Sequence, residues 1–96
     1  LLCGNDLTAL GVLAAFRDAG VDVPGAVKVV GFDDVQGAGF FAPPLTTVRQ
    51  PFQELGHRCL DVLLQASSGR PAGVHRIAPT LRVRASTDAA RAAATG

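Results

Sequence analysis

Val27-Lys28-Val29-Val30-Gly31-Phe32-Asp33-Asp34 is the stretch of sequence that decides the fold. The part before the two acids is almost wholly apolar and rich in β-branched side chains, which is typical of a strand covered on both faces of a parallel sheet. Two adjacent carboxylates then stand at the carboxyl end of the predicted strand. Open α/β sheets bind their ligands beyond the carboxyl ends of their strands. The stretch therefore predicts a sheet and, at its edge, a ligand site.

The start of the sequence repeats this arrangement, because Leu1-Leu2-Cys3-Gly4-Asn5-Asp6 is again a short apolar run that ends in polar side chains. A strand at Leu2–Cys3 is expected to lie beside Val27–Phe32 and parallel to it. Asp6 is predicted to be the N-cap of a helix, because its carboxylate can accept a hydrogen bond from a free first-turn N–H. Apolar residues then recur at helical spacing, and Gly20 is the glycine expected just after the end of the helix.

The second half of the sequence continues the alternation of strands and helices. Thr46–Arg49 is predicted to be a short strand, and a helix is expected to begin at Pro51 and to end at 67–69. Further extended, strand-like chain is predicted at 74–77 and 81–84, broken by Pro79, and residues 88–96 are expected to form a flexible tail. This order is typical of an α/β fold. Because only about four strands are present, and parallel sheets are covered on both faces, the sequence predicts part of an α/β domain.

Composition excludes some classes of protein. Hydrophobic residues make up 48% of the 96, which is ample for a core and argues against a disordered chain. Nine basic and eight acidic residues give a net charge of +1, and the arginines are scattered, so there is no clustered basic face for nucleic acid. No apolar run approaches the ~20 residues that cross a bilayer. The first residue lies inside a predicted strand, which suggests a piece of a longer protein.

The candidate catalytic residues do not stand in a recognisable spacing. Cys3 and Cys59 could form a disulfide in a secreted protein, but two cysteines do not make a disulfide framework. We expect two reduced, mostly buried thiols in a cytoplasmic protein. His57 is predicted to lie in a helix and His75 in an edge strand, so an enzyme is not expected. A metal site at the acid pair is also not expected, because adjacent strand residues point to opposite faces.

The order and spacing of several short motifs resemble one known family. Besides the two strand ends, the motifs are Ala9-Leu10-Gly11, Gly20-Val21-Asp22-Val23-Pro24 and Pro43-Pro44-Leu45-Thr46-Thr47-Val48. Together they resemble the effector-binding domain of lactose-repressor/galactose-repressor family transcription regulators, over roughly residues 2 to 87. Each motif is weak alone, and their combination carries the resemblance.

The resemblance implies a two-lobed architecture of the type I periplasmic-binding-protein kind, built on parallel sheets. Residues 1–48 and 80–87 would belong to the C-terminal lobe, and 50–78 to a returning piece of the N-terminal lobe. The family's helix-turn-helix headpiece has no counterpart in this chain. Operator DNA would therefore be a partner only through a headpiece outside it, and no cofactor or membrane is implied.

The resemblance also implies a site for a small effector, which is expected to be a carbohydrate. Asp33, Asn5, Gln50 and Phe52 match the family's effector contacts, while Asp34 is expected to have a structural role. From spacing alone, Asp33 is equally well explained as a loop acid that caps a following turn. Asn5 could also be a turn residue at the end of a strand, and Phe52 could equally be a core residue.

A homodimer surface is implied as well. Its expected residues are Leu10, Leu13, Ala14, Phe40 and Phe41. A small local core is the alternative explanation for these side chains. The function implied is that of the effector-sensing and dimerisation part of a DNA-binding transcription regulator, a repressor in the family's usual form. A periplasmic sugar-binding protein of an ABC transporter shares the two-lobed fold and is the alternative.

Overall fold

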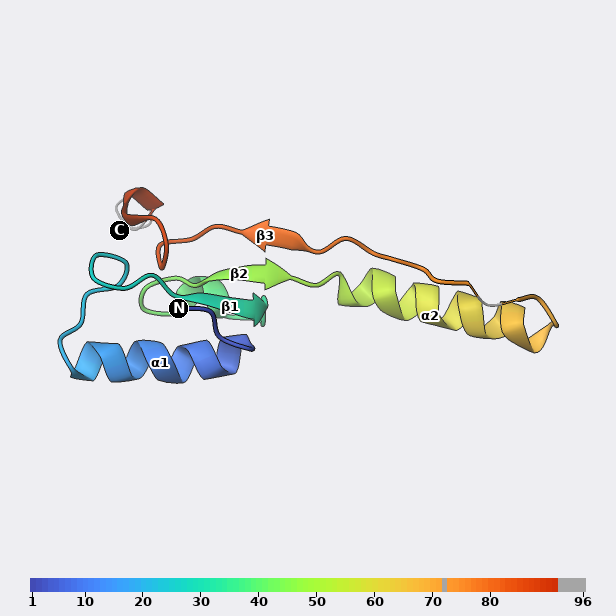
Figure 1. Cartoon of the computed structure of the whole chain (residues 1–96), viewed down its shortest axis with the longest axis horizontal. Helices are drawn as coiled ribbons and strands as arrows, with labels where there is room; N and C mark the ends of the chain where they lie inside the picture. Colours follow the sequence, from blue (N-terminus) through green and yellow to red (C-terminus); the bar gives the residue numbers. More distant parts are fainter. Residues whose placement is uncertain (72, 92–96) are drawn as a thin grey trace. The chain divides into compact units, whose positions relative to one another are not determined.

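A computed structural model describes residues 1–71 and 73–91 of the chain. Its elements are α1 (Asp6–Asp18), β1 (Val30–Asp33), a 3-10 turn η1 (Ala38–Phe40), β2 (Thr46–Arg49), α2 (Phe52–Ser67) and β3 (Thr80–Arg82) (Figure 1). They divide between two compact units. The first unit contains Leu1–Arg49 and the chain from Thr80 onward, and the second contains Gln50–Pro79.

The first unit is built on a mixed sheet with the strand order β1-β2-β3. β1 pairs with β2 in parallel, and β3 pairs with β2 in the antiparallel direction. Leu2 forms a parallel bridge with Val30, which confirms that the two apolar runs are parallel neighbours. β1 begins at Val30, later than predicted. The reason is that the N–H of Val29 donates to the carbonyl of Ser86 at 3.2 Å and so lies outside the ladder.

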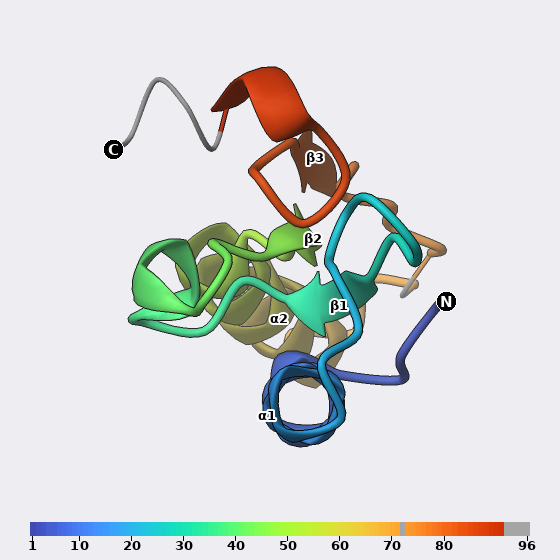
Figure 2. The ribbon, with the colours of Figure 1, turned by 90° about the vertical axis from the view of Figure 1, so that its left-hand side faces the viewer.

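Helix α1 lies against β1, as the end-on view of the helix shows (Figure 2). Its buried side chains belong to the core of the first unit. Ala9 and Leu13 are the buried positions of its apolar stripe. They pack with Val29, Ala38 and Leu45 in one cluster. The burial of two helical positions four residues apart is what the 3.6-residue period requires of a helix that lies on a sheet.

The N-cap of α1 is Asn5, so the prediction that Asp6 caps the helix was wrong. Asn5 has an extended backbone, and its Oδ1 accepts the N–H of Thr8 at 2.8 Å. Asp6 is the first helical residue, and its carboxylate instead accepts hydrogen bonds from the N–H of Val35 and the hydroxyl of Thr47 in the interior of the first unit. Gly20, with a φ of 73°, follows the helix and its C-cap Ala19, as the sequence predicts.

The second unit consists of α2 and the extended chain that follows it. α2 begins directly after Pro51, which is its N-cap, and ends at Ser67 as expected. None of its residues is buried, so the expected burial of Cys59 was wrong. Both cysteines are free thiols, as predicted. None of the described helices is long and apolar enough to span a membrane.

The predicted strand at 74–77 does not form. Val74 is 86% exposed, and without a neighbouring ladder an extended segment has nothing to pair with. The last predicted strand is found as β3, which begins one residue earlier and ends two residues earlier than predicted. Of the expected tail, residues 92–96 lie outside the described part of the chain. Within the rest, Asp88 Oδ1 accepts the N–H of Ala90 at 3.1 Å.

Candidate functional site

The carboxyl end of β1 has an unusual backbone. Asp33 and Asp34 have positive φ values of 120° and 59°, and they are the two non-glycine residues with positive φ in the described chain. Such backbone states cost an ordinary residue on the order of 1–3 kcal/mol each, and they persist only where the surroundings enforce them. Strain of this kind is concentrated at functional sites, which directs attention to the acid pair.

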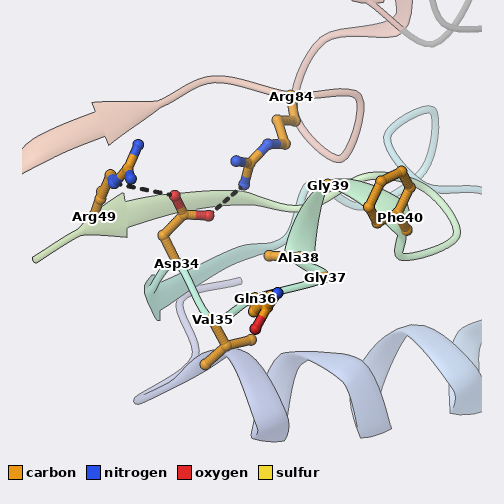
Figure 3. Close-up of a pocket in the computed structure, with 9 residues that line it drawn as sticks. All are labelled: Asp34, Val35, Gln36, Gly37, Ala38, Gly39, Phe40, Arg49 and Arg84. Carbon is orange, nitrogen blue, oxygen red and sulfur yellow. Dashed lines mark hydrogen bonds and ion pairs between the residues drawn. The ribbon is translucent and has the colours of Figure 1, made fainter.

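The second acid is fixed by arginines. Arg84 Nη1 donates to Asp34 Oδ1 at 2.8 Å, and the same nitrogen donates to the carbonyl of Leu45 at 2.9 Å (Figure 3). Arg49 Nε lies 3.9 Å from Asp34 Oδ2, and the Arg49 side chain is 55% exposed. The Asp34 side chain is only 9% exposed. The short pair with Arg84 is therefore the structural contact of Asp34, and the pair with Arg49 is a weaker surface contact.

A buried carboxylate supports the same turn from the other side. Asp6 is completely buried. Its Oδ2 accepts the N–H of Val35 at 2.8 Å, and its Oδ1 accepts the hydroxyl of Thr47 at 2.6 Å. Gly31 makes this possible, because a Cβ at that position would overlap Asp6 Oδ1. The carboxylate thus joins α1, β2 and the segment after the acid pair.

Hydroxyl groups fasten the returning chain to the sheet. Ser86 Oγ donates to the carbonyl of Val29 at 2.6 Å and accepts the N–H of Thr46 at 2.8 Å. Thr46 Oγ1 in turn accepts the N–H of Arg84 at 2.7 Å. Among the described residues, no buried side-chain nitrogen or oxygen atom lacks a hydrogen-bond partner. The polar contacts behind the acid pair are therefore fully satisfied, as a rigid support requires.

An open pocket of about 410 Å³ lies beside Asp34. It is lined by the segment from Asp34 to Phe40 and by Arg49 and Arg84 (Figure 3). The guanidinium groups that reach Asp34 form one wall, and the backbone around η1 forms another. All of these residues belong to the first unit.

The structure brings two of the predicted ligand residues to one edge of the sheet. Asn5 directly precedes Asp6 in the sequence. Asp6 Oδ2 accepts the N–H of Val35, which follows Asp33 by two residues, so Asn5 and Asp33 lie near the same end of the strands. Asn5 already uses its Oδ1 as an N-cap. Gln50 and Phe52 belong to the second unit, where Phe52 is 57% exposed.

The predicted dimer residues differ in exposure. Leu10 is 42% exposed and Phe40 is 93% exposed. Ala14 and Phe41 are partly buried, and Phe41 packs against the core cluster. Leu13 is a core residue with 2% exposure and offers no surface.

The side chains that hold the acid pair in place were not predictable from the sequence. Asp6 was assigned to the wrong role, and Arg84 and Ser86 were not singled out. Arg82 and Arg84 share one face of an alternating segment, but only the fold shows which of them meets an acid. Within residues 1–71 and 73–91, no cluster of three histidine, cysteine or acidic side chains could hold a metal ion. His57 and His75 are both exposed.

Comparisons with known proteins identify the family. Residues 1–87 match the family of the periplasmic binding protein-like domain. The chain is 44% identical over 92 residues to the HTH-type transcriptional regulator MalR of Streptomyces coelicolor, covering 94% of the chain and 27% of that protein. It is 36% identical over 91 residues to the HTH-type transcriptional repressor PurR of Haemophilus influenzae, with 90% and 27% coverage.

Solved structures agree with the sequence relatives. The lac repressor dimer bound to operator and the anti-inducer ONPF superposes with a TM-score of 0.85 and 38% identity, over 90% of this chain and 26% of that one. The transcription regulator GntR from Chromobacterium violaceum gives a TM-score of 0.82 and 34% identity, over 92% of this chain and 33% of that one. The chain thus spans about a quarter to a third of the length of these proteins. It belongs to the lactose-repressor family of transcription regulators, which are not enzymes, and it represents part of their periplasmic-binding-protein-like effector domain.

Proposed function

We propose that this chain is part of the effector-sensing and dimerisation domain of a transcription regulator that binds operator DNA through another part of the protein. The observation that carries the proposal is the strained acid pair at the carboxyl end of β1. It lies where α/β folds bind ligands, and the chain is 38% identical to lac repressor structures that contain ONPF or ONPG. The relatives described above are regulators, which favours this function over an ABC-transporter binding protein.

The ligand is proposed to be a small molecule with several hydroxyl groups, a sugar being the first candidate. Asp33 provides two acceptor oxygens and no donor when ionised, so it selects ligands that present matching O–H or N–H groups. Asn5 adds an amide that can donate. Gln50 and Phe52 are proposed as further contacts on the grounds of the resemblance, with Phe52 offering an apolar face to a sugar ring.

The remaining features of the whole protein follow from the same assignment. Residues 1–48 and 80–87 are assigned to one lobe of the effector domain and 50–78 to the other. The regulator is proposed to act in the cytoplasm as a homodimer. Leu10 and Phe40 are its most exposed interface residues, because both keep large apolar surfaces open in the first unit.

Replacing Asp33 by Asn in the full-length protein tests the ligand site. The change preserves the shape of the side chain but exchanges one acceptor oxygen for a donor. Hydrogen bonds to charged groups contribute ~1.5–3 kcal/mol, so affinity should fall roughly 10- to 100-fold. Calorimetric titration with galactose, maltose and hypoxanthine measures the loss and separates sugar from purine ligands. Operator binding without ligand should be unchanged.

The control is Asp18→Asn, at an exposed acid in the last turn of α1. This variant should bind every probe as the wild type does. Wild-type affinity in Asp33→Asn, for a probe that the wild type binds, would remove Asp33 from the ligand site.

A further inference from the structure

The strained turn after β1 is held by side chains from two distant segments of the first unit. Asp6, at the start of α1, binds the N–H of Val35 at 2.8 Å. Arg84, two residues beyond the end of β3, binds the carboxylate of Asp34 at the same distance. These two contacts fix the backbone of the residues after Asp33. The backbone at Asp33 itself is fixed by its pairing with Arg49 of β2 in the sheet.

The contact with Arg84 is shielded from water. The side chains of Asp34 and Arg84 are 9% and 25% exposed, so their ion pair is screened less than a surface pair. Arg84 Nη1 also donates to the carbonyl of Leu45, which restrains the guanidinium in two directions. A planar guanidinium held in this way is a more rigid support than a flexible ammonium group.

The backbone that carries this guanidinium is itself fixed. The N–H of Arg84 donates to Thr46 Oγ1 at 2.7 Å, and Thr46 Oγ1 donates to the carbonyl of Arg84 at 3.0 Å. Thr46 is buried at the start of β2. Arg84 therefore reaches the turn from a rigid base and not from a surface loop.

We infer that Arg84 is a positioning residue for the ligand site. By holding Asp34 at a φ of 59°, it keeps Asp33 at a φ of 120° and thereby fixes the direction of the neighbouring carboxylate. Without the ion pair the turn relaxes toward an ordinary backbone conformation, and the carboxylate of Asp33 moves away from its binding direction. The inference rests on the proposed function of Asp33 and extends it to a residue two positions beyond the end of β3.

Arg84→Met in the full-length protein tests the inference, since methionine keeps much of the length and removes the charge. The matched control is Arg82→Met, at an exposed arginine of β3 that lies two residues away. Titration with galactose, maltose and hypoxanthine is carried out well below the unfolding temperatures of all variants. Arg84→Met should weaken the binding of the active probe roughly 10- to 100-fold, because the carboxylate of Asp33 moves out of direction and loses its charge-assisted hydrogen bond to the probe, and Arg82→Met should leave the affinity unchanged.

A second measurement needs no ligand. Hydrogen exchange of the backbone amides at positions 34–37 should be faster in Arg84→Met than in the wild type and unchanged in Arg82→Met, since the turn loses one of its supports. Unchanged exchange in Arg84→Met would overturn the inference even if none of the three probes binds.

A double-mutant cycle separates positioning from a general loss of stability. Asp34→Asn removes the charge of the ion pair and Arg84→Met removes its donor. Because both changes act on the same contact, the affinity of the double variant should be close to that of the single variant that binds more weakly. Additive losses contradict the proposed contact. A lower unfolding temperature with wild-type affinity would show that Arg84 has only a structural role.

The outcome for Asp33→Asn distinguishes the two proposals. If Asp33→Asn loses affinity and Arg84→Met keeps it, the positioning role fails and the proposed ligand site stands. If both variants bind a probe as the wild type does, the proposed site fails as well.

Discussion

Gly31 shows how one residue of the motif Gly31-Phe32-Asp33-Asp34 serves the site without touching a ligand. A Cβ at this position would overlap Asp6 Oδ1 and lie 2.9 Å from Leu45 Cδ2. Real Cβ atoms do not approach neighbours so closely, so the glycine is what allows the buried carboxylate to reach Val35 and Thr47. The site thus depends on an absent side chain as much as on those present.

Gly31→Ala is expected to destabilise the full-length protein by about 1–3 kcal/mol, the usual cost of overpacking a well-filled core. Urea-induced unfolding measures the change. The comparison variant is Gly11→Ala in α1, where a Cβ meets nothing within 4 Å. Because alanine favours a helix by up to ~1 kcal/mol over glycine, Gly11→Ala should be neutral or stabilising. Equal stability of the two variants would contradict the packing role of Gly31.

The sequence identified the acid pair but not what holds it. Position at a strand end drew attention to Asp33, since strand ends are recognisable from apolar runs, but it was the family resemblance that favoured a ligand role over a loop acid that caps a turn. Arg84 stands 50 positions from its partner Asp34, and Asp6 stands 29 positions from its partner Val35, and no local pattern shows that these segments meet. Asp6 was predicted to be a cap because local capping chemistry was the visible alternative, whereas the interior donors outcompeted it.

At the scale of elements, α1 presents two different surfaces. Its buried positions are Asp6, Ala9 and Leu13, while Leu7 and Leu10 are 68% and 42% exposed. The helix therefore uses one stripe for its own core and keeps a second apolar stripe open. In the proposed homodimer, the partner subunit would cover this second apolar stripe.

Leu10→Asp is expected to convert the full-length dimer to a monomer, because a carboxylate without a partner is costly in an apolar interface. Analytical ultracentrifugation measures the change. Ala15→Asp is the matched control, since it adds the same charge at an exposed position about 140° around the helix from Leu10. Ala15→Asp should remain a dimer. An unchanged sedimentation coefficient for Leu10→Asp would count against the interface.

Strands were predicted correctly where a β-forming sequence also has a neighbouring strand to pair with. Thr46–Arg49 was predicted with the observed bounds, because its β-branched residues also find partners on both sides in β1 and β3. Residues 74–77 also contain β-branched side chains, at Val74 and Ile77, but no described strand lies alongside to complete a ladder. β-branched side chains indicate that a strand is possible, and hydrogen bonding to a neighbour decides whether it forms.

For the molecule as a whole, the two units differ in how much they bury. The first has a core cluster and a satisfied polar network. In the second, α2 exposes Phe52, Leu60, Leu63 and Leu64 by more than half. A helix with such an apolar stripe contributes little stability until another surface covers it.

Residues 1–96 on their own are therefore expected to unfold without a sharp cooperative transition, or to associate. Uncovered apolar surface favours self-association over a monomeric folded state. Size-exclusion chromatography combined with thermal denaturation followed by circular dichroism tests this. A monodisperse monomer with a single sharp transition would show that the covering surface is not needed.

The antiparallel pairing of β2 with β3 has a consequence for protein engineering. Arg49, the last residue of β2, stands directly opposite Thr80, the first residue of β3. The second unit, Gln50–Pro79, is thus an insertion between two strands, β2 and β3, that would otherwise form a β-hairpin. A two-residue Asn-Gly turn has the geometry to join such facing residues. Excising residues 50–79 in favour of that turn would leave every strand pairing of the first unit in place, and would convert it into a miniature scaffold that carries the acid pair and Arg84 together.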